Sequence, residues 1–312
     1  MKYIFGPVPS RRLGISLGVD IIPAKTCSLN CVYCECGLTT NLSLERKSFF
    51  PYKEIINELE TFLNNNPRPD YITFSGSGEP TLNSDIGEIA LYIKGKGIPS
   101  VLLTNGTLLY RDDVFEDIKS IDLIIPSLDA GDEETFKKIN HPHKALKFNK
   151  YIEGLKRLNS LKKRVWLEIF IVKGINDSKT LLSRIKNITS TLNVEKIQLN
   201  TVDRPPALKG CTGVSIKVLE DIKHWWDDKR VEVIYPYKKR KDYKAFKEHI
   251  ADFILETLKR RPMTVNDISN ITGLHTEELF KYIEILKAEG TITPYIKDRG
   301  IFYKKRRGHE LY

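Results

Sequence analysis

Six short apolar runs recur between residues 16 and 200, and their repetition limits the fold more than any other feature of the sequence. They cover residues 16–23, 71–74, 100–103, 121–125, 164–172 and 196–200. Each has the length of a buried strand, and stretches with helical periodicity, such as 51–64, lie between them. Strands that alternate with helices are typical of a parallel sheet with right-handed crossovers. The sequence therefore predicts an α/β fold.

The first run leads into a cysteine-rich stretch at residues 26–37. Cys27, Cys31 and Cys34 have the spacing C-x-x-x-C-x-x-C, close enough for three thiolates to meet around one object. That object is a zinc ion or an iron–sulfur cluster, unless the three are unrelated core residues. Three thiolates could hold three irons of a [4Fe–4S] cube and leave the fourth iron open to a substrate or cofactor. Such a strand end is where α/β enzymes usually place their chemistry.

Glycines and polar residues follow the later runs. A Gly-rich turn with the sequence S-G-S-G-E-P comes directly after the strand at 71–74. Glycine permits close backbone approach, so this turn can expose amides and carbonyls to a ligand. The next three strands end in Thr104 and Asn105, in Ser127 and Asp129, and in Lys173. The Ser, Thr, Asn and Asp residues among them could equally cap helices.

The cysteine pattern, with Tyr33 as its aromatic residue, resembles the C-x-x-x-C-x-aromatic-C signature of the radical S-adenosylmethionine (SAM) superfamily. The resemblance implies a [4Fe–4S] cluster on Cys27, Cys31 and Cys34 whose open iron chelates the amino and carboxylate groups of SAM. It further implies reductive cleavage of SAM to methionine and a 5′-deoxyadenosyl radical, which takes a hydrogen atom from the substrate. A reductant such as ferredoxin or flavodoxin would supply the electron.

The same resemblance assigns residues to SAM. The Gly-rich turn is similar to the family's G-G-E-P motif, in which backbone and Glu bind the SAM ammonium, although Ser77 stands between the glycines here. The polar residues at later strand ends match positions that bind the ribose and the methionine moiety. The implied cofactor-binding set is Tyr33, Gly76, Ser77, Gly78, Glu79, Thr104, Asn105, Ser127, Asp129 and Lys173.

Two further cysteines, Cys36 and Cys211, remain of the five in the chain. The odd total indicates a reducing compartment rather than a disulfide scaffold. Cys36 lies two residues beyond Cys34 and could donate a hydrogen atom to a substrate radical or bind an auxiliary centre. Cys211 could be a small apolar filler. No catalytic residue is assigned beyond these two candidates.

The resemblance implies a partial (β/α)6 barrel over residues 1–235, with a lateral opening that suits a large substrate. Four segments are similar to the branch related to the tRNA wyosine-base synthases, namely F-G-P-V-P-S-R-R-L-G, S-G-S-G-E-P-T-L, I-P-S-L-D-A-G and N-T-V-D-R-P-P. Archaeal wyosine synthases carry a second cluster, for which this chain lacks the cysteines. Residues 5–14 themselves predict a structured loop, and Arg11 and Arg12 could reach the carboxylate of SAM or an acidic substrate, or simply face solvent.

Residues 236–312 predict a separate domain with three helices and a hairpin, which looks like a winged helix. The second helix begins at Thr264, with Asp267 completing a capping box, and the third carries Leu279, Phe280, Ile283 and Leu286. This segment has 17 Lys or Arg and 11 Asp or Glu, so 17 − 11 = +6 of the chain's net charge of +10. Four glutamates on the third helix make it a poor face for DNA, so RNA backbone or a protein partner fits better.

These observations predict a radical SAM enzyme that acts on a macromolecule, with RNA or tRNA base modification slightly favoured. Radical modification of a protein or peptide, including activation of a glycyl-radical enzyme, is the alternative. A winged-helix transcription regulator that senses an iron–sulfur cluster is the alternative of another class. No signal peptide or membrane span is apparent, so we expect a cytoplasmic protein without membrane contact.

Overall fold

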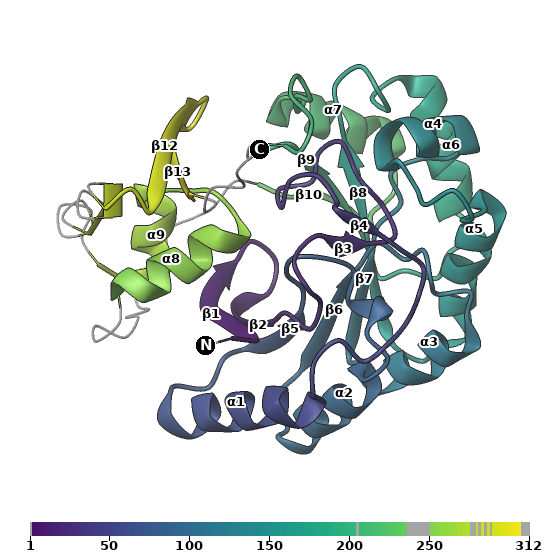
Figure 1. Ribbon diagram of the computed structural model, residues 1–312. Coiled ribbons are helices and arrows are strands. Elements are labelled where there is room, and N and C mark those ends of the chain that lie inside the picture. Colours follow the sequence, from purple (N-terminus) through teal and green to yellow (C-terminus); the bar gives the residue numbers. More distant parts are fainter. Residues whose placement is uncertain are drawn as a thin grey trace.

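An eight-stranded sheet forms the centre of the molecule (Figure 1), with the strand order β1-β2-β5-β6-β7-β8-β9-β10. The computed structural model describes residues 2–203, 206–235, 250–274, 279, 282–283, 286–287 and 289–306. The strands of the sheet are β1 (Ile4–Ser10), β2 (Gly14–Val19), β5 (Tyr71–Phe74), β6 (Ser100–Thr104), β7 (Leu123–Pro126), β8 (Arg164–Ile171), β9 (Lys196–Thr201) and β10 (Val231–Val233). From β2 to β10 every neighbouring pair is parallel.

All six predicted strands are present in this sheet, and two further strands of the same sheet were not predicted. The sequence interpretation of residues 5–14 as a loop is wrong, because most of this segment forms β1, which pairs antiparallel with β2. Its prolines are tolerated because β1 is an edge strand, where a residue without an N–H loses no ladder bond. The other addition, β10, is only three residues long and extends the parallel sheet beyond β9.

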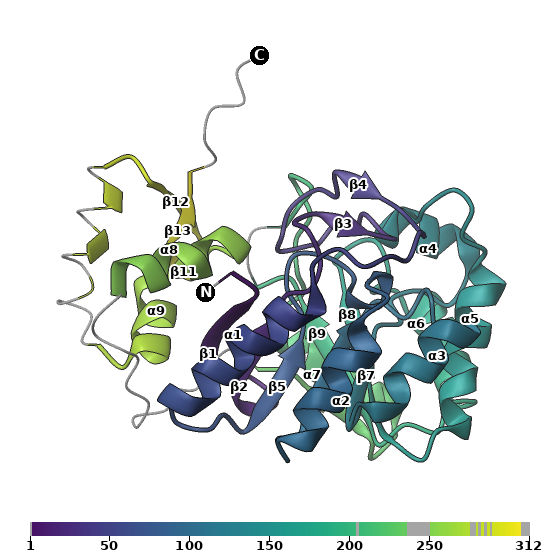
Figure 2. The same ribbon diagram turned by 60° about the horizontal axis from the view of Figure 1, so that its bottom comes forward.

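Helices form an outer layer around the parallel strands (Figures 1 and 2). They are α1 (Tyr52–Asn65), α2 (Ile86–Gly95), α3 (Asp112–Asp117), α4 (Glu133–Asn140), α5 (Phe148–Arg157), α6 (Lys179–Thr189) and α7 (Ile216–Trp226), together with the short 3₁₀ helices η1 (Pro80–Leu82), η2 (Ile118–Ser120) and η3 (Leu158–Ser160). Side-chain caps begin several of them: Asp132 accepts from the Thr135 amide at 2.8 Å to start α4. No helix in the described part of the chain is long and apolar enough to cross a bilayer.

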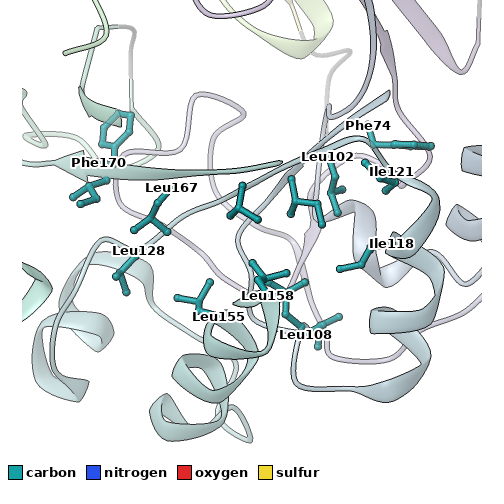
Figure 3. Packing of buried hydrophobic residues seen from close by; sticks show 14 of the residues in the cluster. Phe74, Leu102, Leu108, Ile118, Ile121, Leu128, Leu155, Leu158, Leu167 and Phe170 are labelled. Atoms are coloured by element: carbon teal, nitrogen blue, oxygen red, sulfur yellow. The ribbon is translucent and has the colours of Figure 1, made fainter. Parts of the chain in front are cut away.

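The core lies between the sheet and this helical layer (Figure 3). Leu102 and Leu167 project from two strands toward the side where Leu108, Leu155 and Leu158 lie, and Phe74 of a third strand lies beside Ile121. These side chains are almost fully buried, and removing apolar surface of this kind from water is the main stabilising contribution to folding. The packing holds the strands rigidly and fixes where their carboxyl ends lie.

The described residues of 250–306 make up a second unit, which we call the C-terminal module. It contains α8 (Ile250–Arg260), β11 (Met263–Thr264), α9 (Val265–Thr272), β12 (Ile292–Lys297) and β13 (Gly300–Lys305), and its strands form an antiparallel sheet in the order β11-β13-β12. The predicted capping box is confirmed, because the Thr264 side chain and the Asp267 side chain each accept from the other's backbone N–H. Leu279, Ile283 and Leu286 are buried in its own core.

Two sequence predictions fall partly outside the described residues. The predicted domain boundary at 235/236 lies beside residues 236–249, which the structure does not describe. The predicted third helix includes Phe280, which also lies outside the described residues. Both therefore stay predictions. The described helices α8 and α9 pack against β1, at the edge of the large sheet (Figure 1).

Candidate active site

A cavity of about 360 Å³ lies between the inner side of the sheet and the C-terminal module. Strand residues such as Ser16, Thr73 and Asn200 form one part of its wall, and Cys34 and Cys36 of the cysteine loop form another. The module supplies the rest through Thr257, Arg260, Arg261, Met263, Asp267 and Ile271. The cavity therefore brings together segments from both ends of the chain.

The cysteine loop is held at the top of the sheet by a short parallel pair of strands, β3 (Thr26–Cys27) and β4 (Asn41–Leu42). N–H donors surround two of its three motif sulfurs. The Asn105 side-chain amide lies 3.4 Å from the Cys27 sulfur, and that of Asn140 lies 3.3 Å from the Cys31 sulfur. Such donors favour a sulfur that carries negative charge.

The thiols differ in acidity. Burial raises the pKa of Cys27 to about 12 and raises the pKa of Cys31 well above its usual range. Its neighbour Cys36 lowers the pKa of Cys34 to about 7. Burial thus disfavours the charged form of Cys27 and Cys31, and a bound cation would favour it.

The donor set is three thiols on one loop, and two of them receive side-chain amide donors. Thiolates of this kind are the ligands of iron–sulfur clusters, and they also bind zinc. Among the residues that the structure describes, no three His, Cys, Asp or Glu side chains converge on one ion.

The Gly-rich turn docks directly on the cysteine loop. The Lys25 amide donates to the Ser77 carbonyl at 2.8 Å, and the Glu79 amide donates to the Thr26 carbonyl at 3.1 Å. A Cβ atom at Gly78 would lie only 2.0 Å from that Thr26 carbonyl oxygen. Glycine is therefore required here by the close approach of two backbones.

Glu79 connects this turn to the end of β6. Its Oε1 accepts from the Thr81 amide and hydroxyl and from the Thr104 hydroxyl at 2.6 Å, and its Oε2 accepts from the Asn105 amide at 2.7 Å. Burial raises the pKa of Glu79, and the hydrogen bonds oppose that shift. Because Asn105 in turn contacts Cys27, the carboxylate positions both the turn and the cysteine loop.

Asp129 plays the corresponding part on the other side of the loop. It accepts from the Tyr33 hydroxyl, from the Asn140 side chain at 2.8 Å and from the Phe170 amide at 2.9 Å. Burial raises the pKa of Asp129 to about 6, and these bonds act against the rise. The Tyr33 ring stacks on Phe170 with centroids 4.0 Å apart. The aromatic residue of the motif is thus fixed by the ends of β7 and β8.

The remaining predicted residues fall into two groups, one at the cavity wall and one away from it. Gly76, Ser127 and Cys36 line the cavity, and the Cys36 thiol donates to the Gly76 carbonyl at 3.3 Å. Lys173 is exposed and Cys211 is buried, and neither contributes to the cavity wall. Their assignments as cofactor-binding and catalytic candidates stay predictions.

A polar group inside the barrel was missed by the sequence interpretation. Arg12, whose side chain is only 13% exposed, forms an ion pair with Glu168 at 2.9 Å. The same carboxylate oxygen accepts from Asn200 at 2.9 Å, and Arg12 also donates to Gln198 at 3.2 Å. The available signal was a glutamate in the middle of an otherwise apolar strand, because buried charges are rarely left unpaired.

Two arginine–aspartate pairs tie the module to the barrel, and neither was foreseen. Arg260 of α8 lies 3.4 Å from Asp20, which follows β2 and also accepts from the Ser77 hydroxyl at 2.7 Å. Arg299 of the β12–β13 turn lies 2.8 Å from Asp203, which follows β9. The module therefore contacts segments near both ends of the sheet.

Comparison with protein families agrees with this geometry. The model of the radical SAM superfamily matches residues 21–183. This chain belongs to the radical SAM superfamily. It is a radical SAM enzyme, and its cofactors are a [4Fe–4S] cluster and SAM. That conclusion rests on the family match, whereas the residues that hold each cofactor are argued from the structure.

Several relatives and solved structures are similar to this chain. A UPF0026 protein of Methanocaldococcus jannaschii is 31% identical over 98% of this chain and 96% of its own length. A protein of Brachyspira hyodysenteriae named GTPase Obg is 40% identical over 86% of this chain, which spans only 40% of that relative. The structure of TYW1 with a lysine-pyruvate adduct bound has a TM-score of 0.53 at 19% identity, covering 72% of this chain and 75% of TYW1. SuiB of Streptococcus suis bound to precursor peptide SuiA has a TM-score of 0.55 at 14% identity, covering 69% of this chain and 48% of SuiB. These two structures share the fold.

Proposed function

We propose that this protein is a single-cluster radical SAM enzyme that abstracts a hydrogen atom from an RNA base, with tRNA as the favoured substrate. The observation that supports this most is the shared cavity, whose wall combines Cys34 of the cysteine loop with Arg260 and Arg261 of the C-terminal module. Arg260 and Arg261 thus lie at the same cavity as Cys34, which is where we propose that the chemistry occurs. A cytoplasmic reductant such as ferredoxin or flavodoxin completes the proposed system.

Within this proposal, Cys27, Cys31 and Cys34 hold the cluster. When bound, the cluster and SAM supply the 5′-deoxyadenosyl radical. The side chains of Asn105 and Asn140 donate to two of the sulfurs and so orient the loop. Gly76 and Ser127 line the cavity and are the proposed direct SAM contacts, whereas Glu79 and Asp129 position the loops around them.

The C-terminal module is proposed to be a winged helix that holds the substrate. The order helix, strand, helix and hairpin supports this interpretation. Burial and then the neighbouring Lys259 lower the pKa of Lys305, whereas Glu256, which forms an ion pair with Lys259, raises it. Lys304 beside them is exposed. A phosphate at this position would be a further anionic partner for these lysines.

An RNA-binding experiment tests this proposal. Wild-type reconstituted enzyme should bind an unmodified tRNA transcript with an affinity that falls steeply as salt rises, and the transcript should stimulate release of 5′-deoxyadenosine. The double variant Lys259→Gln with Lys305→Gln should reduce the salt slope by about 1 to 2. Salt-independent binding together with no stimulation would contradict an RNA substrate.

A protein or peptide substrate, which includes a glycyl-radical enzyme, is the second candidate because the hairpin has an apolar tip. Ile296 is 84% exposed and pairs in register with Ile301, which is 49% exposed. Two adjacent exposed isoleucines favour contact with a protein. The variant Ile296→Asp should leave tRNA binding unchanged under the RNA proposal, and should abolish stimulation by a protein substrate under this alternative.

We propose that this chain is related to the wyosine branch in its barrel fold and not in its reaction. Likeness to TYW1 concerns the fold, and Cys36 and Cys211 are too few to hold a second four-thiolate cluster. Cys36 lines the cavity and remains a catalytic candidate. Cys211 does not line the cavity. A reaction that differs from wyosine formation therefore fits the residues better. A cluster-sensing regulator would release no 5′-deoxyadenosine, so the same assay also tests the alternative of another class.

A further inference from the structure

Arg260 of the C-terminal module occupies an unusual position in the cavity wall. It is the last residue of α8, and its side chain is only 12% exposed. Its guanidinium lies over the ring of Phe5 at 4.5 Å from the centroid. The same ring lies against Gly18, where an added Cβ would approach within 2.1 Å of the ring. The contact with Phe5 thus holds the guanidinium beside β1 and β2.

The hydrogen-bonding capacity of this guanidinium is largely unused. Its Nε lies 3.4 Å from Asp20, a long contact for a charged pair. Its Nη1 is buried and has no hydrogen-bond partner. A buried charged N–H without a partner is costly to a folded protein, and a water or an ion that completes its hydrogen bonds is one way in which that cost is met.

Other cationic groups of the cavity are already engaged. Arg12 pairs with Glu168 and donates to Gln198, and Arg11 and Arg261 each have interactions of their own. Within the described part of the chain, Arg260 is therefore the cavity arginine that retains a buried donor without a partner. Its carboxylate neighbour Asp20 also accepts from the Ser77 amide and hydroxyl, which places Arg260 next to the Gly-rich turn.

We propose that the guanidinium of Arg260 binds an anionic oxygen of a molecule held in the active-site cavity. The chemistry is that of a carboxylate or phosphate oxygen, for which arginine offers paired N–H donors. Two sources can supply it: the carboxylate of SAM, or an acidic group on the substrate. The proposal rests on the proposed SAM site but does not require that the substrate be RNA.

The C-terminal module thereby forms part of the binding site of the enzyme. A residue near position 260 completes a binding site whose cysteines lie near position 30, so the cavity is incomplete without the module. Binding of the anion and seating of the module against β1 then stabilise each other, because both depend on the same guanidinium.

Binding measurements on the full-length, anaerobically reconstituted enzyme test this inference. With the cluster left oxidised, isothermal titration gives the affinities for SAM, for decarboxylated SAM and, in the presence of SAM, for inorganic phosphate. Wild type, Arg260→Met and Arg260→Lys are compared. Arg184→Met serves as the matched control, because Arg184 pairs with Asp132 on an outer helix and does not line the cavity.

The two possible sources of the anion give different binding results. If the SAM carboxylate is the anion, Arg260→Met weakens SAM binding about tenfold or more and changes decarboxylated SAM less than twofold. If the substrate supplies it, SAM binding changes less than twofold, and phosphate binds wild type at least about tenfold more tightly than Arg260→Met. Arg260→Lys should keep part of either effect, since it retains the charge but not the paired donors.

Three results would overturn the inference. They are an equal loss for SAM and decarboxylated SAM, no change for SAM or phosphate in either variant, and an equal effect in Arg184→Met. Iron and sulfide content and circular dichroism establish that each variant is folded and loaded. Failure of wild type to bind SAM at all would instead contradict the proposed function.

Discussion

The two walls of the cavity differ in how their polar groups are satisfied. Behind the barrel wall, buried Glu79 and Asp129 accept hydrogen bonds from backbone and side chains on several strand ends, and these contacts link the Gly-rich turn, the cysteine loop and β8. On the module wall, Arg260 makes one long contact with Asp20 and keeps a donor without a partner. The barrel wall is organised before any ligand binds, and the module wall leaves capacity for one.

This difference separates two tasks. A site that controls a radical must hold its cofactors in a fixed geometry, which a connected network of buried hydrogen bonds provides. A site that selects a substrate needs donors that the protein has not already used. Substitutions in the barrel wall should therefore have large effects on cofactor binding, and substitutions in the module wall should have smaller and more selective ones.

The largest effect is expected for Cys31→Ala. Removal of one of three ligands should abolish the cluster and with it all release of 5′-deoxyadenosine, measured by iron and sulfide analysis and by chromatography. The control Cys211→Ala changes a buried thiol outside the cavity and should keep both properties. Retention of SAM cleavage in Cys31→Ala would break the assignment of the barrel wall.

Gly78→Ala should come next. The new methyl group would meet the Thr26 carbonyl oxygen at 2.0 Å, so the turn and the cysteine loop must move apart. We expect loss of most bound iron and a fall in SAM affinity of more than tenfold. Gly95→Ala, where nothing lies within 4 Å of the added Cβ, should be neutral or slightly stabilising. Equal behaviour of the two variants would show that the docking of turn on loop is unimportant.

Glu79→Gln should cost about 2 to 3 kcal/mol of unfolding free energy, measured by urea denaturation. The substitution replaces one acceptor oxygen of the carboxylate by an NH₂ group. This NH₂ group must then face an N–H or O–H group that donated to Glu79. Loss of a hydrogen bond to a buried charge costs about 1.5–3 kcal/mol. Thr81→Val removes only one hydroxyl donor to the same carboxylate and should cost about 1 kcal/mol. A smaller loss for Glu79→Gln than for Thr81→Val would contradict the central role of the carboxylate.

The smallest effect is expected for Arg299→Met on the module side. Its pair with Asp203 is partly exposed, and such pairs contribute about 0–1 kcal/mol and weaken as salt rises. Cluster content should be unchanged, whereas hydrogen exchange at β1 should become faster because the module detaches more often. An effect on iron content as large as that of Gly78→Ala would remove the distinction between the two walls.

Local patterns predicted much of the barrel wall. The six parallel strands, the cysteine loop and the Gly-rich turn are each encoded within a few consecutive residues, and periodicity or spacing reveals them. Edge strand β1 escaped prediction because Pro7 and Pro9 have the composition of a loop, and only its position beside β2 makes them acceptable. Thr104 shows a second limit of sequence patterns. Its position at a strand end was predicted, but the pattern did not indicate that its hydroxyl donates to Glu79.

The module wall was not predictable in this way. Asp20 and Arg260 are separated by 240 positions, and nothing near either residue indicates the other. Their contact depends on how α8 docks against β1, which is a property of the assembled chain. On the barrel side, half-buried Glu168 did have a local signal, because it interrupts an apolar strand.

The two arginine–aspartate pairs also fasten the module to the barrel at two separate points. Because one lies beside β2 and the other beyond β9, the module can leave the sheet as a body only when both have separated. Salt weakens such pairs, so departure of the module from the sheet should become more frequent as ionic strength rises.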